Sequence, residues 1–341
     1  MASRRVRLKD IAARAGVSAM TVSRVLNQHA HVSEVVRARV LQLVKEYDYQ
    51  PNFIARSLVS RRSRTVGFLV PAINLSYFFE IIRGIETVFG RNGYHLILGH
   101  TGEDAARERA ELGVLRSRQV DGLIIAPALN VNDIEPYLAL QKLELPAVFV
   151  DRCFPGLECS YVYSNDQAGG RLVGELLLRL GHRRIAFLAA ALRDPEYCRM
   201  KSCRDFLEAA GVKTDRRLVR LAGVTRADGY REAGHLLGLA APPTAVFAHN
   251  DEVAIGVYQR AREMKIRIPG DLTVIGYGNL HWSGYVDPPL TTVDQKPFGI
   301  GSEAARVLLE RIEKRGTRPT RILVEPELIT RGSHAACQPR R

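Results

Sequence analysis

The sequence predicts a small all-α N-terminal unit followed by a larger two-lobed α/β domain. The chain has 341 residues, more than one hydrophobic core usually organises. From Thr65 onward, short apolar stretches typical of buried strands alternate with amphipathic stretches typical of helices. Residues 1–64 hold 13 Lys and Arg against 4 Asp and Glu, so they carry +9 of the total net charge of +13. This concentration is typical of a nucleic-acid-binding unit attached to a nearly neutral body.

The basic N-terminal unit also carries a regular apolar pattern. Four apolar residues lie at i, i+3, i+4 and i+7, and this pattern ends at Gly16; they are Leu8, Ile11, Ala12 and Ala15. Ser18 is placed to cap a second helix that buries Val22, Val25 and Leu26. Ser33 can cap a third, with Val36, Val40, Leu43 and Val44 at helical spacing. Three short helices, with a tight turn between the first two, predict a helix-turn-helix.

Two segments carry a specific resemblance, LKDIAARAGVSAMTVSRVLN and VSEVVRARVLQLVKEYDYQPNFIARSL. They resemble the headpiece and hinge of the lactose-repressor/galactose-repressor (LacI/GalR) family of transcriptional regulators. The resemblance implies a helix-turn-helix DNA-binding headpiece over residues 1–50 and a hinge helix and linker over 51–64. It also implies a cytoplasmic homodimer that binds a pseudo-palindromic double-stranded DNA operator and a small-molecule, carbohydrate-derived effector.

The resemblance places the DNA contacts on the second helix. It implies that Ala19 and Met20 face base edges and that Arg24 follows one turn on, since Arg can bridge guanine O6 and N7. The remaining expected contacts, to phosphates or at the helix start, are Ser18, Thr21, Ser23 and Asn27. Three alternatives stay open: Met20 in the core, Ala19 without a contact, and Arg24 on a phosphate only.

The hinge is expected to form around Pro51. About eight residues are too few for a stable isolated helix, so we expect order only on DNA with a dimer partner. In the family this helix enters the minor groove and a leucine wedges into the central base step. The matching residues are Asn52, Ala55 and, as the wedge, Leu58. A flexible linker is the alternative.

The remainder resembles the periplasmic-binding-protein fold, most clearly in VDGLII, GHRRIAF, AVFAHNDEVAIG and YVDPPLTTVDQ. We assign residues 65–332 to a periplasmic-binding-protein-like, two-lobed effector-binding and dimerisation domain and residues 333–341 to a tail. That fold implies three crossings between the lobes, which we place near Ser164, Val293 and Glu325. The tail lacks the leucine heptads of the family's tetramers, so a dimer is expected.

Effector residues should follow the strands, because parallel sheets bind ligands beyond the carboxyl ends of their strands. The resemblance implies an aromatic wall, two polar clamps and a residue near the hinge between the lobes, which are Tyr77 with Phe78, Arg199 with Asn250, and Gln295. The other candidates are Asn74, Ser76, Asp151, Arg193 and Trp282. Asp151, Arg152 and Asp251 could equally be helix caps or salt-bridged scaffold.

One departure from the family bears on the effector class. Gly278 stands where the family often has an aspartate that binds ligand hydroxyls. Loss of that carboxylate, with Arg193 and Arg199 present, favours an anionic ligand. The stretches LGHTG and GYGN resemble the gluconate-repressor branch, so a sugar acid such as gluconate is the expected effector. A neutral sugar or a nucleobase remains open.

Other function classes lack their motifs. The sequence has no GxxxxGK[ST] and no GxSxG, and its GxGxxA match, Gly299 to Ala304, follows Pro297 at the expected start of a helix. The five cysteines form no CxxC pair. An enzyme, a cofactor and a metal site are therefore not expected. The charged N-terminus and the short apolar runs predict neither a signal peptide nor a membrane partner. A periplasmic-type solute-binding protein is the non-regulator alternative.

Overall fold

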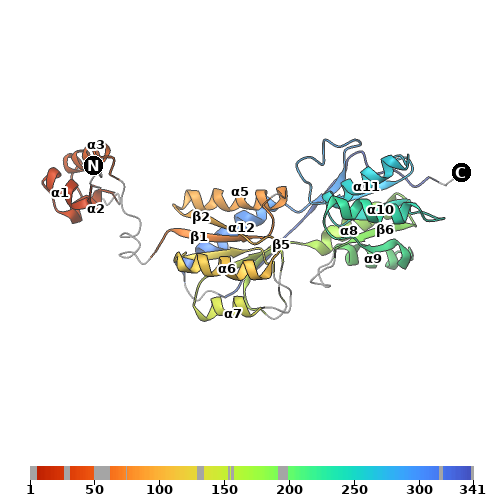
Figure 1. Ribbon diagram of the computed structural model, residues 1–341, viewed down its shortest axis with the longest axis horizontal. Helices are drawn as coiled ribbons and strands as arrows, with labels where there is room; N and C mark the ends of the chain where they lie inside the picture. The colour runs from red at the N-terminus through yellow and green to blue at the C-terminus, as the bar shows by residue number, and fades with distance from the viewer. Residues whose placement is uncertain are drawn as a thin grey trace. The chain divides into compact units, whose positions relative to one another are not determined.

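The computed structural model forms two compact units, residues 1–63 and residues 64–341 (Figure 1). No helix in the described part of the chain is long and apolar enough to cross a membrane. The described residues are 6–26, 31–49, 62–73, 75–128, 134–152, 154, 157–190, 199–314 and 318–338.

The N-terminal unit contains α1 (Leu8–Ala15), α2 (Ala19–Leu26) and α3 (Glu34–Glu46). Gly16 ends α1 in the left-handed conformation with φ 69°, which glycine adopts without steric cost. The Thr21 amide donates to Ser18 Oγ at 3.1 Å, which is the cap expected for α2. The helices enclose a small core of Ile11, Ala12, Ala15, Val22, Val25, Val40 and Tyr49. The helix-turn-helix prediction is confirmed.

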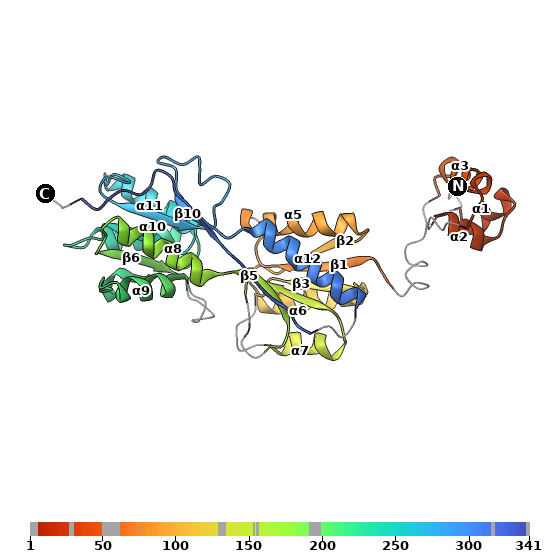
Figure 2. The same cartoon turned by 180° about the vertical axis from the view of Figure 1, so that it is seen from behind.

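Lobe 1 of the larger unit is a six-stranded sheet with the order β11-β5-β4-β3-β1-β2, and every pair is parallel. Helices α5 (Ser76–Arg91) and α12 (Pro297–Glu313) cover one face, and α6 (Ala105–Ser117) and α7 (Glu135–Lys142) cover the other (Figures 1 and 2). The strands are β1 (Thr65–Val70), β2 (His95–His100), β3 (Gly122–Ile125), β4 (Ala147–Val150), β5 (Ser160–Ser164) and β11 (Arg321–Val324).

Lobe 2 repeats this plan with the order β12-β10-β9-β8-β6-β7, in which only β12 pairs antiparallel among the described strands. Helices α8 (Asp166–Arg179) and α9 (Arg199–Ala209) cover one face, and α10 (Arg226–Leu237) and α11 (Asp251–Glu263) cover the other. The strands and the short 3₁₀ helix are β6 (Ile185–Ala189), η1 (Arg216–Leu218), β7 (Val219–Leu221), β8 (Ala245–Ala248), β9 (Thr273–Tyr277), β10 (Thr291–Asp294) and β12 (Glu327–Ile329).

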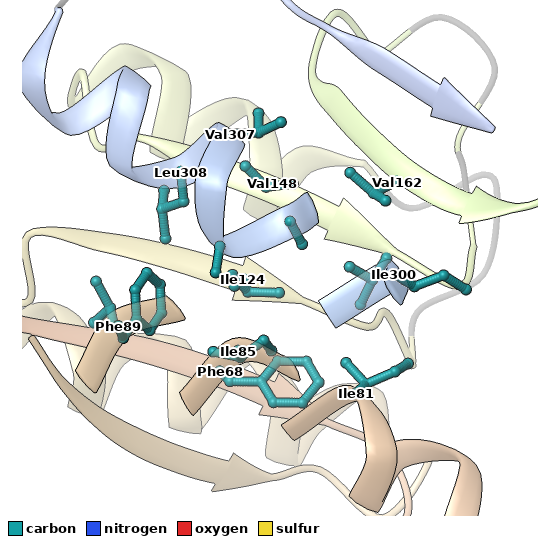
Figure 3. Packing of buried hydrophobic residues seen from close by; sticks show 14 of the residues in the cluster. Phe68, Ile81, Ile85, Phe89, Ile124, Val148, Val162, Ile300, Val307 and Leu308 are labelled. Carbon is teal, nitrogen blue, oxygen red and sulfur yellow. The ribbon is translucent and has the colours of Figure 1, made fainter. Parts of the chain in front are cut away.

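The core of lobe 1 shows why α5 and α12 can lie so close together. Ile81 and Ile85 of α5 and Ile300 of α12 are fully buried in one cluster on the sheet (Figure 3). A Cβ added at Gly301 would overlap the carbonyl of Ile81 across the helix pair. Gly301 belongs to the GxGxxA match, which lies in the first turns of α12, as predicted from its place after Pro297. The lack of a side chain at Gly301 lets the two helices approach closely.

The chain passes between the lobes from β5 to α8, from β10 to α12 and from β11 to β12. These crossings confirm the predicted positions. Two polar contacts join neighbouring crossings: Asn165 Nδ2 donates to Glu325 Oε1 at 2.8 Å, and Lys296 forms an ion pair with Glu327.

The segment after β12 packs against lobe 2. The Val274 amide donates to the Ser333 carbonyl at 2.9 Å, and the Cys337 amide donates to the Leu180 carbonyl at 2.8 Å. Ser333 is fully buried. Residues 333–338, which the sequence alone suggests are a tail, therefore extend the surface of this lobe.

Candidate effector and DNA-binding sites

The carboxyl ends of strands from both lobes border a cavity of about 810 Å³. Lobe 1 contributes the segment around the start of α5 and the start of α12, and lobe 2 contributes the segments after β9 and β10. The lining side chains include aromatic rings from both lobes, which suits the mostly apolar character of small-molecule sites. The lining is Ile73, Leu75, Ser76, Tyr77, Phe79, Glu80, Glu252, Gly278, Asn279, Leu280, His281, Trp282, Asp294, Lys296, Pro297, Phe298 and Gly299.

Arg199 is the centre of a buried polar network in lobe 2. Its Nε and Nη2 donate to Asp166 Oδ2 at 2.9 and 2.7 Å, and its Nη1 donates to the His249 carbonyl at 3.1 Å. The guanidinium lies over the Tyr277 ring, 3.8 Å from the centroid, and Tyr277 Oη donates to Asp166 Oδ1 at 2.9 Å. Because the pair is mostly buried, Asp166 compensates the Arg199 charge directly.

Two buried polar atoms near this network, Ser76 Oγ and His249 Nδ1, have no hydrogen-bond partner within the described residues. The Tyr77 phenol interacts with Asp151, and the Ser164 hydroxyl interacts with Tyr277. Leaving such a group unpaired costs about 1–3 kcal/mol, so native proteins rarely retain one without a use. Ser76 Oγ and His249 Nδ1 could bind the hydroxyl or carbonyl groups of a small molecule.

The protonation states at this site follow from burial. Burial, together with the neighbouring Arg199 and Arg152 charges, holds the pKa of His249 well below its usual range, so the imidazole is neutral. Burial and the Asp151 charge raise the pKa of Tyr77 well above its usual value, so the phenol keeps its proton. Both side chains can therefore offer hydrogen bonds to an uncharged ligand group.

On the lobe 1 side, Asp151 follows β4 in a left-handed conformation with φ 69°. Arg152 beside it donates to both carboxylate oxygens of Glu103, at 2.8 and 2.6 Å, and to the Pro127 carbonyl at 2.5 Å. Burial raises the pKa of Asp151, and the Arg152 charge opposes that rise. Arg152 thus ties together the ends of three adjacent segments at the edge of the cleft.

The predicted effector residues separate into groups. Ser76, Tyr77 and Trp282 line the cavity, and Arg199 with Asp151 belongs to the polar groups just described. Asn250 caps α11, because its Oδ1 accepts from the Val253 amide at 2.8 Å and its Nδ2 donates to the Val224 carbonyl at 3.0 Å. Gln295 is buried at the second crossing, and Phe78 lies in the core of lobe 1. Asn74 and Arg193 lie outside the described residues.

Sequence reasoning selected Phe78 and missed Phe79. Phe79 is 54% exposed and lines the cavity, whereas Phe78 is buried with Ile81, Ile85 and Phe89 on one face of α5. Those four residues lie at i, i+3, i+7 and i+11, so helical periodicity could have assigned Phe78 to the core. His249 and Phe298 were also missed, and no local pattern distinguishes them.

The second helix of the N-terminal unit presents its predicted contact residues to solvent. Met20 is 64% exposed, which excludes the alternative that it belongs to the core. Ala19 and Arg24 are exposed as well, while Thr21 and Ser23 are half-buried. Asn27, Asn52, Ala55 and Leu58 lie outside the described residues. The exposed set is what a helix that reads a DNA groove would offer.

Comparison with known proteins agrees with both halves of this description. The model for bacterial regulatory proteins of the lacI family matches residues 7–52, and that for a periplasmic binding protein-like domain matches residues 175–334. The chain is 33% identical to the ribose operon repressor of Haemophilus influenzae over 327 residues, 96% of this chain and 98% of that protein. It is also 33% identical over 328 residues to the HTH-type transcriptional repressor PurR of Vibrio atlanticus, with 96% and 98% coverage. The crystal structure of the lac repressor dimer bound to operator and the anti-inducer ONPF has a TM-score of 0.87 at 26% identity, covering 98% of this chain and 100% of that one.

Proposed function

We propose that this chain, which belongs to the lacI family of bacterial regulatory proteins, is a transcriptional repressor whose operator affinity is controlled by a small carbohydrate-derived effector. One observation carries the proposal: a basic helix-turn-helix unit and a two-lobed domain with a cavity between its lobes occur in one chain. A helix-turn-helix unit can bind DNA without a two-lobed domain, and a two-lobed domain can bind a small molecule without a helix-turn-helix unit. Together they can couple the binding of a small molecule to the binding of DNA.

The DNA-binding half works through charge and shape. The net charge of +9 in residues 1–64 attracts the phosphate backbone without sequence preference. Met20 and Arg24, exposed on α2, supply the sequence-dependent contacts in the major groove. A cytoplasmic homodimer would read two half-sites, and Leu58 of the hinge would wedge into the minor groove between them.

For the effector we propose a sugar acid such as gluconate. Gly278 supports it, because the cavity has no carboxylate at the position where the family often binds ligand hydroxyls. Restoring one is also sterically disfavoured, since Gly278 has φ +127°, which L residues rarely adopt. Arg199 would attract the acid group, and Arg193, which lies outside the described residues, is the second cation that the sequence suggests.

A neutral sugar is the second candidate, and the Arg199–Asp166 ion pair favours it. A carboxylate ligand would have to compete with Asp166 for the guanidinium, whereas a hydroxyl can bind the remaining polar atoms without breaking the pair. Glu80, Glu252 and Asp294 in the cavity wall also disfavour an anion and can accept hydrogen bonds from hydroxyls.

The sole tryptophan of the sequence, Trp282, lines the cavity, so its fluorescence can distinguish between the two candidate effectors. We expect its emission to change on titration with the effector, tested with gluconate, D-glucose, D-ribose and hypoxanthine. The same ligand at about 100 times its dissociation constant should stabilise the native state by about 2.7 kcal/mol. A fluorescence response to gluconate alone supports a sugar acid as the effector. A response to a neutral sugar alone would show that the effector is a neutral sugar instead. A shift in melting temperature without a Trp282 response would place the ligand outside this cavity.

The DNA-binding part of the proposal is tested by selecting bound sequences from a random duplex library and footprinting the protein on the selected duplex. Two symmetric half-sites are expected, and Arg24→Ala should remove about 1–3 kcal/mol of discrimination at one base pair of each half-site. Protection of a single asymmetric site, or no selected sequence at all, would contradict the proposal.

A further inference from the structure

The segment between β9 and β10 forms a continuous wall of the cavity, residues 278–282. Its backbone begins with two consecutive residues at positive φ, Gly278 at 127° and Asn279 at 47°. Glycine adopts positive φ without steric cost, and Asn is among the residues that tolerate the left-handed region. Side chains outside the segment hold this bend in place.

Asp251 supplies the first support, from the first turn of α11. Its carboxylate is fully buried and accepts from the Leu280 amide at 2.8 Å, from Ser283 Oγ at 2.6 Å and from Thr292 Oγ1 at 2.5 Å. Burial raises the pKa of Asp251, and these three donors oppose that rise. The carboxylate thus connects both ends of the loop to the helix that follows β8.

Arg331 supplies the second support, from the segment after β12. Its Nη2 donates to Asn279 Oδ1 at 2.7 Å and its Nη1 donates to the Leu290 carbonyl at 2.7 Å. Asn279 in turn donates through Nδ2 to Asp294 Oδ2 at 3.2 Å. The left-handed residue at the start of the wall is therefore fixed on two sides.

We propose that Asp251 and Arg331 are positioning residues for effector binding: they hold the wall that carries Asn279 and Trp282 without lining the cavity themselves. The proposal rests on the proposed function, because it takes this cavity as the effector site. It assigns Asp251 to the scaffold of the site, one of the two readings that the sequence leaves open. It also makes the C-terminal segment part of the site's framework.

The test follows the wall directly, in the full-length protein without effector or DNA. Asp251→Ala removes the acceptor of the Leu280 amide, so hydrogen exchange of that amide should accelerate about 5- to 30-fold, the factor that one or two kcal/mol produces. The Trp282 emission should shift to longer wavelength, and acrylamide should quench it more strongly. Asp251→Asn keeps one acceptor oxygen and can donate to Thr292 Oγ1, so it should restore slow exchange.

A matched control is Asp271→Ala, which removes an exposed carboxylate of the same lobe that pairs with Arg267. It should leave the Leu280 amide and the Trp282 emission as in the wild type. If Asp251→Ala does not fold, Arg331→Met tests the second support with the same measurements. The proposal is overturned if the folded variant exchanges at the wild-type rate, or if exchange rises equally throughout lobe 2. If Asp251→Ala accelerates exchange of the Leu280 amide but the wild-type protein binds no operator, the proposed function is refuted and the positioning role of Asp251 stands.

Discussion

The two lobes share an order of layers but hold their cleft edges differently. Lobe 1 uses Arg152 and Glu103, whose side chains are 31% and 42% exposed. Lobe 2 uses Arg199 and Asp166, which are 12% and 18% exposed. Arg199 lies over the Tyr277 ring, and Asp166 accepts from the Tyr277 hydroxyl. Two lobes with the same order of layers therefore hold their cleft edges with ion pairs of different strength. The buried pair cannot lose one partner without leaving an uncompensated charge, whereas water can replace either partner of the half-exposed pair.

Truncation of one large side chain in each core should strongly destabilise that lobe. Phe68 of β1 and Phe187 of β6 are both buried at their sheets, so Phe68→Ala and Phe187→Ala should each destabilise their lobe by about 3–5 kcal/mol. Urea unfolding followed by hydrogen exchange in each lobe measures this. A loss confined to one variant would show that the cores are not equivalent.

Substitution of the arginine at each cleft edge should cost the two lobes different amounts of stability. Arg199→Ala leaves the Asp166 carboxylate buried without its charge partner, so it should cost about 3–5 kcal/mol of stability. Arg152→Ala loses a half-exposed pair with Glu103, worth no more than about 1 kcal/mol, and also the charge beside buried Asp151, so its total cost should be smaller than that of Arg199→Ala. The double variant Arg199→Ala/Asp166→Asn should recover part of the loss. Equal costs for the two arginines in urea unfolding would remove the contrast drawn above.

Acid should affect the lobes in opposite directions through two buried groups. Burial lowers the pKa of His182, so the stability it contributes is present above about pH 6.5 and is lost as pH falls below that value. Burial raises the pKa of Glu108 in lobe 1, so the folded state gains relative stability as that carboxyl takes up a proton. Melting curves between pH 5 and 8 should show His182→Gln approaching the wild type at low pH. Glu108→Gln should gain stability relative to the wild type as pH rises, because the wild-type carboxyl then carries a buried charge. Parallel curves for both variants would contradict these signs.

The sequence was a good guide to order along the chain and a poor guide to pairing across it. Helical spacing located α1 to α3, and strand alternation located both sheets, because these patterns are local. The partner of Arg199 is Asp166, 33 positions away, and the role of Asp251 depends on Leu280, Ser283 and Thr292. Such contacts depend on which loops meet at the ends of the strands, and the periodicity of a local sequence segment does not reveal this. Phe78 is different, because its spacing from Ile81 and Ile85 is a local pattern that indicates the core, although we expected it in the aromatic wall.

The central claim is that a molecule bound between the lobes changes the affinity for DNA. The direct measurement is the dissociation constant of the full-length protein for its selected operator, with and without a saturating sugar or sugar acid that alters Trp282 emission. We predict a change of about 5- to 150-fold for the wild type, matched by an equal change in effector affinity when operator is added. An operator affinity that stays the same while the cavity is filled would contradict it.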